Sequence, residues 1–296
     1  MIHIIRVCVL ILLAIITAGS VPGAAAPRHR QKHRKQAAKP AVHDAITTCA
    51  VFRDAGTSRI VPLKHFRPIQ YLTGKSRKLP EMNSRIVKLL LSYPRDGCHG
   101  YWWPRGAEAG NAYDGCTTDI LLNGQLVMRG EQKGRTYCCG LTLEVFYRAI
   151  EGKKPAHYTW TSETAELFKR LWFCRVRYSP GPEEALLAYG MGRRIASPDK
   201  ALPGDFVQIW RCDKTGHSVI FLSWARDAAG KIQAMHYWST QPGTKGIGFT
   251  AELAGKSGNM IDPQKTSITR LEPSTRWKKG NPDDYLNRQT VDPGGP

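Results

Sequence analysis

Apolar residues recur at helical spacing in several stretches of the chain. In residues 83–92, 141–150 and 162–172 they lie three or four positions apart, which predicts three amphipathic helices that each bury one face. A fourth helix is expected from Pro182, since proline suits the first helical position, to about Gly190. The central part of the chain is therefore predicted to be largely helical.

The pattern changes after residue 204. Residues 205–210, 217–224 and 232–238 are short runs rich in aromatic and β-branched side chains, separated by turn residues. Such runs predict consecutive antiparallel strands. Residues 120–128 predict a further hairpin, with Asn123 and Gly124 at its turn. Helices followed by strands indicate an α+β domain rather than a βαβ repeat.

The first 26 residues have the pattern of a secretory signal peptide. Arg6 precedes an apolar run over 7–18, and three alanines at 24–26 offer a cleavage site before Pro27. The run is shorter than the roughly 20 residues of a membrane-spanning helix. We therefore expect a chain that is secreted or held in the periplasm or cell envelope, with an uncleaved N-terminal anchor as the alternative.

The remaining sequence divides by composition. Residues 27–42 are basic and lack aromatic side chains, which predicts a disordered segment. Residues 43–95 are interpreted as an N-terminal accessory region and 96–275 as the main domain. Residues 276–296 are expected to form an irregular C-terminal tail.

The chain is strongly basic, with 43 Lys and Arg against 24 Asp and Glu and a net charge of +19. If the protein is exported, nucleic acid is not the expected partner of these basic residues. An anionic envelope polymer such as the cell wall, or peripheral electrostatic contact with the envelope, fits it better. Non-specific surface charge is the alternative interpretation.

Seven of the eight cysteines lie beyond the predicted signal peptide. In an oxidising compartment thiols tend to form disulfides, and an odd number leaves at least one unpaired. Cys98 and Cys116 are candidates for a local pair. The spacings contain neither CxxC nor HExxH, so no metal or other cofactor is expected.

One thiol has the context of a nucleophile. Cys138 and Cys139 directly precede Gly140 and the helix predicted over 141–150. The start of a helix lowers a thiol pKa toward the reactive thiolate. His217 begins a later predicted strand, and His236 lies in the strand after it. This layout is typical of a cysteine hydrolase.

Four short motifs resemble those of the NlpC-type cell-wall amidopeptidases, a branch of the papain-like superfamily. They are the steps 137–141 (YCCGL), 202–207 (LPGDFV) and 217–222 (HSVIFL), followed by His236. The resemblance implies a papain-like fold with helices packed on a small antiparallel sheet. Two departures stand out, because Tyr137 occupies the position of the family's aspartate and Cys139 that of its serine.

By this resemblance Cys138 is the nucleophile, His217 its acid–base partner, and His236 the residue that orients the imidazole. Aromatic residues near the nucleophile line the substrate groove in the family, which makes Tyr101, Trp102 and Tyr137 candidate substrate-binding residues.

The expected function is hydrolysis of an amide bond in the peptide part of peptidoglycan. One alternative is acyl transfer, or hydrolysis of another amide, by the same Cys–His pair. A second is a non-catalytic, disulfide-stabilised envelope-binding domain in which Cys138 and Cys139 are both structural.

Overall fold

The computed structural model describes residues 49–54, 57–62, 79–104, 113–153, 159–174, 176–227 and 229–286. Residues 1–26 and 27–42, predicted as signal peptide and basic segment, lie outside these ranges. In the part of the chain that is described, no helix is both long and apolar enough to cross a membrane.

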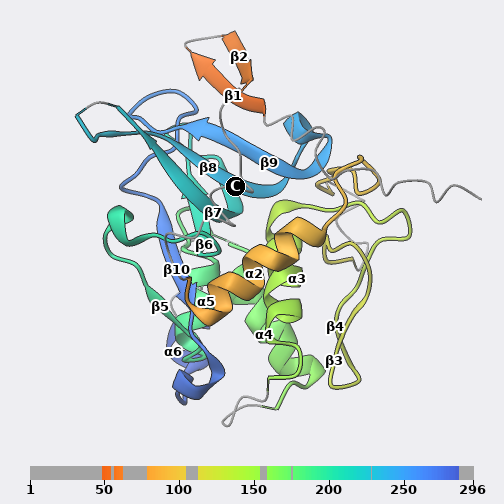
Figure 1. Ribbon diagram of the computed structural model, residues 1–296. Helices are drawn as coiled ribbons and strands as arrows, with labels where there is room; N and C mark the ends of the chain where they lie inside the picture. The colour runs from red at the N-terminus through yellow and green to blue at the C-terminus, as the bar shows by residue number, and fades with distance from the viewer. Residues whose placement is uncertain are drawn as a thin grey trace, which may run out of the picture. The chain divides into compact units, whose positions relative to one another are not determined.

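An antiparallel sheet of six strands forms one half of the fold (Figure 1). Its order is β9-β8-β7-β6-β10-β5. The strands are β5 (Gly192–Arg194), β6 (Phe206–Trp210), β7 (Gly216–Arg226), β8 (Ile232–Gln241), β9 (Gly246–Leu253) and β10 (Ser267–Leu271). The predicted strands at 205–210, 217–224 and 232–238 are confirmed as β6, β7 and β8.

Two hairpins accompany this sheet. One, β1 (Cys49–Asp54) with β2 (Thr57–Pro62), adds to β9 through a short parallel pairing of β1. The other, β3 (Ile120–Leu122) with β4 (Gln125–Met128), forms a separate two-stranded sheet. Its turn residues Asn123 and Gly124 have φ of 52° and 80°, the left-handed backbone that asparagine and glycine tolerate in a tight hairpin. This hairpin was predicted from the sequence.

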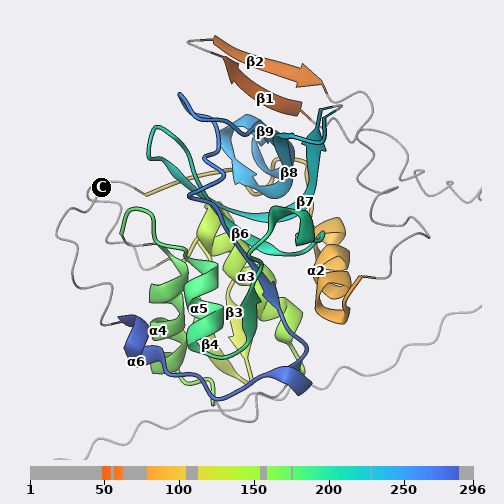
Figure 2. The ribbon, with the colours of Figure 1, turned by 90° about the vertical axis from the view of Figure 1, so that its left-hand side faces the viewer.

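The helices are α2 (Glu81–Ser92), α3 (Cys138–Ile150), α4 (Ser162–Trp172), α5 (Pro182–Ala188) and α6 (Pro282–Leu286). The first four confirm the predicted helices, and the whole is an α+β fold. In place of a wholly irregular C-terminal tail, the chain forms the short helix α6. Figure 2 shows α3 between α2 on one side and α4 and α5 on the other.

The helix that begins at Cys138, α3, packs against β7 and β8 and is covered by α2. Met82, Ile86 and Leu90 of α2 are fully buried and belong to the same apolar core as α3. Although residues 43–95 are interpreted from sequence as an accessory region, α2 is therefore an integral part of the main core.

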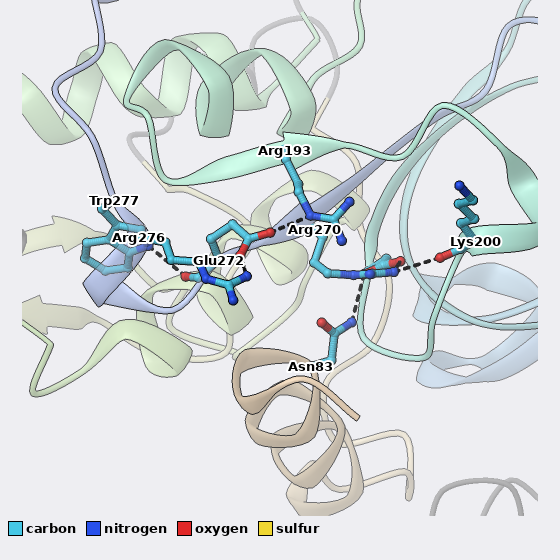
Figure 3. A network of polar contacts seen from close by, with 8 residues as sticks. Asn83, Arg193, Lys200, Arg270, Glu272, Arg276 and Trp277 are labelled. Carbon is cyan, nitrogen blue, oxygen red and sulfur yellow. Dashed lines mark hydrogen bonds and ion pairs between the residues drawn. The ribbon is translucent and has the colours of Figure 1, made fainter. Parts of the chain in front are cut away.

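A buried ion pair attaches α2 to the sheet (Figure 3). Asp205 is fully buried and accepts hydrogen bonds from Arg270 of β10 at 2.7 and 2.8 Å. Asn83 of α2 donates to the same carboxylate at 2.8 Å and to the carbonyl oxygen of Pro203 at 2.9 Å. Asp205 thus has a structural role, joining α2, β10 and the start of β6.

Arg270→Ala is expected to lower the free energy of unfolding by about 3–5 kcal/mol, because it leaves a buried carboxylate without its counterion. Urea denaturation followed by circular dichroism measures this change. Arg276 is the matched control, since it pairs with Glu272 at 3.2 Å but is 72% exposed. Arg276→Ala should change stability by less than about 0.5 kcal/mol. Equal losses in the two variants would contradict the role assigned to Asp205.

Candidate active site

Cys138 is the first residue of α3, at a helix start that no side chain caps. Tyr137, at the N-cap, has extended backbone (φ −134°, ψ 162°) and makes no side-chain capping hydrogen bond. The first turn also contains no acidic residue. Since the first amides and the dipole of a helix favour negative charge, this position stabilises a thiolate.

Two glycines let a neighbouring segment pass close to this helix start. A Cβ atom at Gly140 would lie 1.9 Å from the carbonyl oxygen of Asp114. A Cβ atom at Gly115, which has φ of +70°, would lie 2.4 Å from the Tyr137 ring. The Gly115 carbonyl oxygen accepts a hydrogen bond from the Tyr137 backbone N–H at 3.2 Å. Gly140 in the sequence motif is therefore required for packing.

A buried carboxylate secures the same helix further along. Glu144 is fully buried and accepts hydrogen bonds from the Tyr93 hydroxyl at 2.9 Å and from Arg148 at 2.7 Å. It also accepts from the backbone N–H and the hydroxyl of Thr117, both at 2.7 Å. These contacts connect α3 to the end of α2 and to the segment that follows Gly115.

Thr142 joins the first turn of α3 to β7. Its hydroxyl donates to the carbonyl oxygen of Cys139 at 3.1 Å and accepts from the Trp172 indole N–H at 3.1 Å. With its own proton used, it accepts from the Ser218 hydroxyl at 2.9 Å. Thr142 is one turn beyond Cys138, and Ser218 is next to His217, so this contact fixes the start of α3 relative to the histidine.

His217 lies near Cys138 and changes its acidity. The pKa of the Cys138 thiol is held well below its usual range, first by a hydrogen bond from the Cys139 thiol and then by the charge of His217 and the backbone N–H of Ser218. Burial acts in the opposite direction. Cys138 is therefore favoured as a thiolate, the nucleophilic form.

The His217 ring is 5% exposed, and its Nε2 atom has no hydrogen-bond partner among the described residues. The edge of the Tyr237 ring packs against the imidazole, with 5.7 Å between ring centroids. A ring nitrogen that no protein group occupies is suited to exchange a proton with a substrate.

A cavity of about 300 Å³ opens beside His217. Polar side chains that line this cavity bind one another. Glu252 forms an ion pair with Arg211 and accepts a hydrogen bond from the Tyr237 hydroxyl at 2.9 Å. The same hydroxyl lies 3.1 Å from Oε1 of Gln241. This network holds Tyr237 and Gln241 in the cavity wall with His217.

The structure does not bring His236 to this pair. His236 lies opposite Ser223 in the β7–β8 register, and its Nδ1 is 2.9 Å from the Ser223 hydroxyl. That is six residues along β7 from His217, or roughly 20 Å at about 3.3 Å per residue. Tyr237, the next residue, faces His217, so His236 points to the opposite face of the sheet. Burial lowers the pKa of His236 to about 4.

Gln241 is the β8 residue that the register places across from His217. Ile220 pairs with Trp238, and continuing this antiparallel pairing by three residues aligns His217 with Gln241. The Ser239 hydroxyl donates to the carbonyl oxygen of Ser218 at 2.8 Å, consistent with that alignment. This partner could have been found from the sequence. Counting residues outward from the turn over 227–230 on both strands pairs position 217 with about 241.

The three predicted substrate-binding aromatics have different places. Tyr101 lines the cavity and pairs with Thr136, two residues before Cys138. Trp102 lies outside the lining, stacked on Tyr113 at 5.1 Å with the Arg135 guanidinium 3.7 Å from its ring. Tyr137 is 6% exposed and packs in the core. Only Tyr101 is therefore positioned to meet a substrate in this cavity.

The six cysteines whose side chains are described are free thiols: Cys98, Cys116, Cys138, Cys139, Cys174 and Cys212. The suggested Cys98–Cys116 disulfide is not present in this structure, where Cys98 is exposed and Cys116 is fully buried, and it stays a prediction. Across the described ranges, no group of three His, Cys, Asp or Glu side chains is arranged to hold a metal ion.

Comparison with known proteins gives no match: no family model, no curated protein and no solved structure is significantly similar to the chain.

The lowered pKa of Cys138 predicts selective alkylation in mild acid. Iodoacetamide should modify Cys138 at pH values where Cys98, whose pKa is raised by its hydrogen bond to Asp96, stays unmodified. Peptide mass spectrometry of samples alkylated across a pH series measures both midpoints. His217→Ala should raise the Cys138 midpoint by about 1–3 pH units, because it removes the neighbouring positive charge. Coincident midpoints for Cys138 and Cys98 would show that Cys138 is not activated.

Proposed function

We propose that this chain is a secreted cysteine hydrolase of papain-like, NlpC-type fold that cleaves an amide bond in the peptide part of peptidoglycan. The observation that carries the proposal is the thiol of Cys138 at an uncapped helix start, with its pKa lowered next to a buried histidine that borders a cavity. An α+β core, with the nucleophile's helix packed on an antiparallel sheet, supports the fold assignment.

The reaction follows from this arrangement. The Cys138 thiolate attacks the amide carbonyl, and the free amide N–H groups at the start of α3 stabilise the negative charge that develops on its oxygen. Protonated His217 gives its proton to the leaving nitrogen, so an amine departs and a thioester to Cys138 remains. His217 then takes a proton from water, which attacks the thioester and releases the acid and the thiolate.

Gln241 replaces His236 as the proposed positioning residue. An imidazole needs a second contact to keep one orientation. The Nε2 atom of His217 has no hydrogen-bond partner among the described residues, and Gln241 lies across from His217 in the same cavity wall, so it is the residue proposed to supply that contact during the reaction. Its Oε1 atom lies 3.1 Å from the Tyr237 hydroxyl, which donates to Glu252 of the Glu252–Arg211 ion pair. His236, on the opposite face and neutral near pH 7 because of its lowered pKa, is given a structural role with Ser223.

The charge of the chain fits an anionic substrate layer. After loss of Arg6 with the signal peptide, 42 basic residues face 24 acidic ones, a net charge of +18. Such a surface concentrates an enzyme on acidic wall polymers. The cavity beside His217, at about 300 Å³, is at the small end of ligand sites and suits a short peptide segment rather than a folded protein.

Cys138→Ala should abolish release of new amino groups from purified peptidoglycan, lowering the rate by about 10⁴-fold or more because no other group can form the thioester. Mass spectrometry of the soluble products measures cleavage and identifies the bond. Cys98→Ala is the control and should retain full activity. Unchanged lysis by Cys138→Ala would refute the mechanism, and products carrying an added amine would indicate acyl transfer instead of hydrolysis.

Gln241→Ala is expected to reduce kcat by about 10- to 100-fold with little change in KM, because a misoriented imidazole slows proton transfer without removing substrate contacts. His236→Gln, which keeps a polar side chain near Ser223, should change kcat less than about threefold. Steady-state kinetics on an isolated wall peptide gives both values. A larger loss in His236→Gln than in Gln241→Ala would restore His236 as the orienting residue.

A further inference from the structure

A third thiol, Cys174, lies behind the nucleophile. It follows Phe173, the C-cap of α4, and has left-handed backbone with φ of 48°. Its Sγ lies 3.7 Å from the carbonyl oxygen of Trp172 and 3.8 Å from that of Ser179. The partly buried thiol is therefore held by carbonyl groups on both sides of it in the chain.

This loop packs beside the start of α3. The Trp172 indole donates to Thr142, one turn beyond Cys138, at 3.1 Å. The Phe173 ring lies 5.8 Å from the ring of Tyr137, the residue before Cys138. Two successive residues before Cys174 thus contact the helix start on both sides of the nucleophile.

The far side of the loop lies next to β6, the strand that pairs with the His217-bearing strand β7. A Cβ atom at Gly181 would lie 2.4 Å from the Cys174 Sγ and 3.3 Å from Oε1 of Gln208. Gln208 pairs with Ser218 in the β6–β7 register, and its Oε1 is buried with no hydrogen-bond partner among the described residues. The Cys174 thiol therefore shares a small buried polar space with β6, one residue from His217.

The charge of Cys138 reaches this thiol. Burial raises the pKa of Cys174 well above its usual range, and the negative charge of Cys138 raises it further. The lowered pKa of Cys138 and the raised pKa of Cys174 thus favour the thiolate at the first sulfur and the thiol at the second. Loss of the charge on Cys138 would remove part of what keeps Cys174 protonated.

We propose that Cys138 is a site of reversible oxidation by peroxides and that Cys174 is the thiol that resolves it. In the first step the Cys138 thiolate attacks a peroxide oxygen, the O–O bond breaks, and sulfenic acid and hydroxide form. In the second, the Cys174 sulfur attacks the Cys138 sulfur, a disulfide forms, and water leaves. A dithiol reductant reverses this step and is itself oxidised to its disulfide. Under the proposed function this disulfide also stops catalysis, because the Cys138 sulfur is then no longer available to attack a substrate.

Cys139 is the less suitable partner, although it is nearer in sequence. Consecutive Cα atoms are about 3.8 Å apart, whereas disulfides usually span about 4.4–6.8 Å. Cys138 and Cys139 are also both held in the first turn of α3. A Cys138–Cys139 disulfide would therefore have to distort the helix start.

The test treats the full chain with one equivalent of hydrogen peroxide and maps its tryptic peptides without reduction. The expected product is a disulfide between the peptide 136–148, which contains both Cys138 and Cys139, and the peptide 171–175, which contains Cys174. In Cys174→Ser, Cys138 should instead remain as sulfenic acid and be trapped by dimedone, at least about tenfold more than in the unmodified chain. Cys139→Ser should form the same linked product, which assigns the bond to Cys138.

Equal dimedone labelling of Cys138 with and without Cys174, or a disulfide confined to peptide 136–148, would overturn the proposal. The experiments distinguish failure of the oxidation proposal from failure of the proposed hydrolase function. A linked product in a protein without amidase activity would leave the oxidation site standing and reject the hydrolase. Amidase activity without the linked product would do the reverse.

Discussion

The hydrogen bond between Thr142 and Ser218 is the contact on which the candidate site depends. This hydrogen bond is buried, and the Trp172 indole of α4 also donates to Thr142. The Thr142 hydroxyl therefore joins the start of α3 to β7 and to α4. His217 is next to Ser218 and Cys138 is one helical turn before Thr142, on elements from different parts of the chain. Removing the Thr142 hydroxyl would leave two buried donors unsatisfied, at about 1–3 kcal/mol each, and would release the spacing between thiol and imidazole.

Local patterns predicted most of the fold because they are set by the elements themselves. The apolar face of α4 matches its predicted range, and the β3–β4 turn follows from the left-handed preference of Asn123 and Gly124. The strands β9 and β10 and the helix α6 were not predicted. Their places are set by long-range pairing, since β10 is hydrogen-bonded between β5 and β6, and by tertiary packing that overrides weak local preference.

The sequence predicts those parts of the candidate site that a single helix or strand positions. The helix start at Cys138 and the strand start at His217 are readable from local sequence, and the structure brings both together. The partner on β8 required a register, which depends on where the turn lies and on bulges, such as those in β7 near Ser223. The sequence interpretation therefore names His236, a histidine in that strand, whereas the register aligns Gln241 with His217. Residue type pointed to His236, whereas pairing geometry points to Gln241.

Tyr137, at the position where the resembled sequence motif has an aspartate, shows how the helix start is held without a cap. An aspartate there would stabilise the first amides of α3, with an effect of about 1 kcal/mol, but it would also occupy donors and bring negative charge next to the thiolate. The Tyr137 ring instead packs edge-on against Trp103, Tyr113 and Phe173 at 5.0–5.8 Å. Aromatic pairs of this kind contribute about 0.5–1.5 kcal/mol each beyond their buried area. Packing thus replaces capping at this position and leaves the amide groups at Cys138 available to an anion such as the Cys138 thiolate.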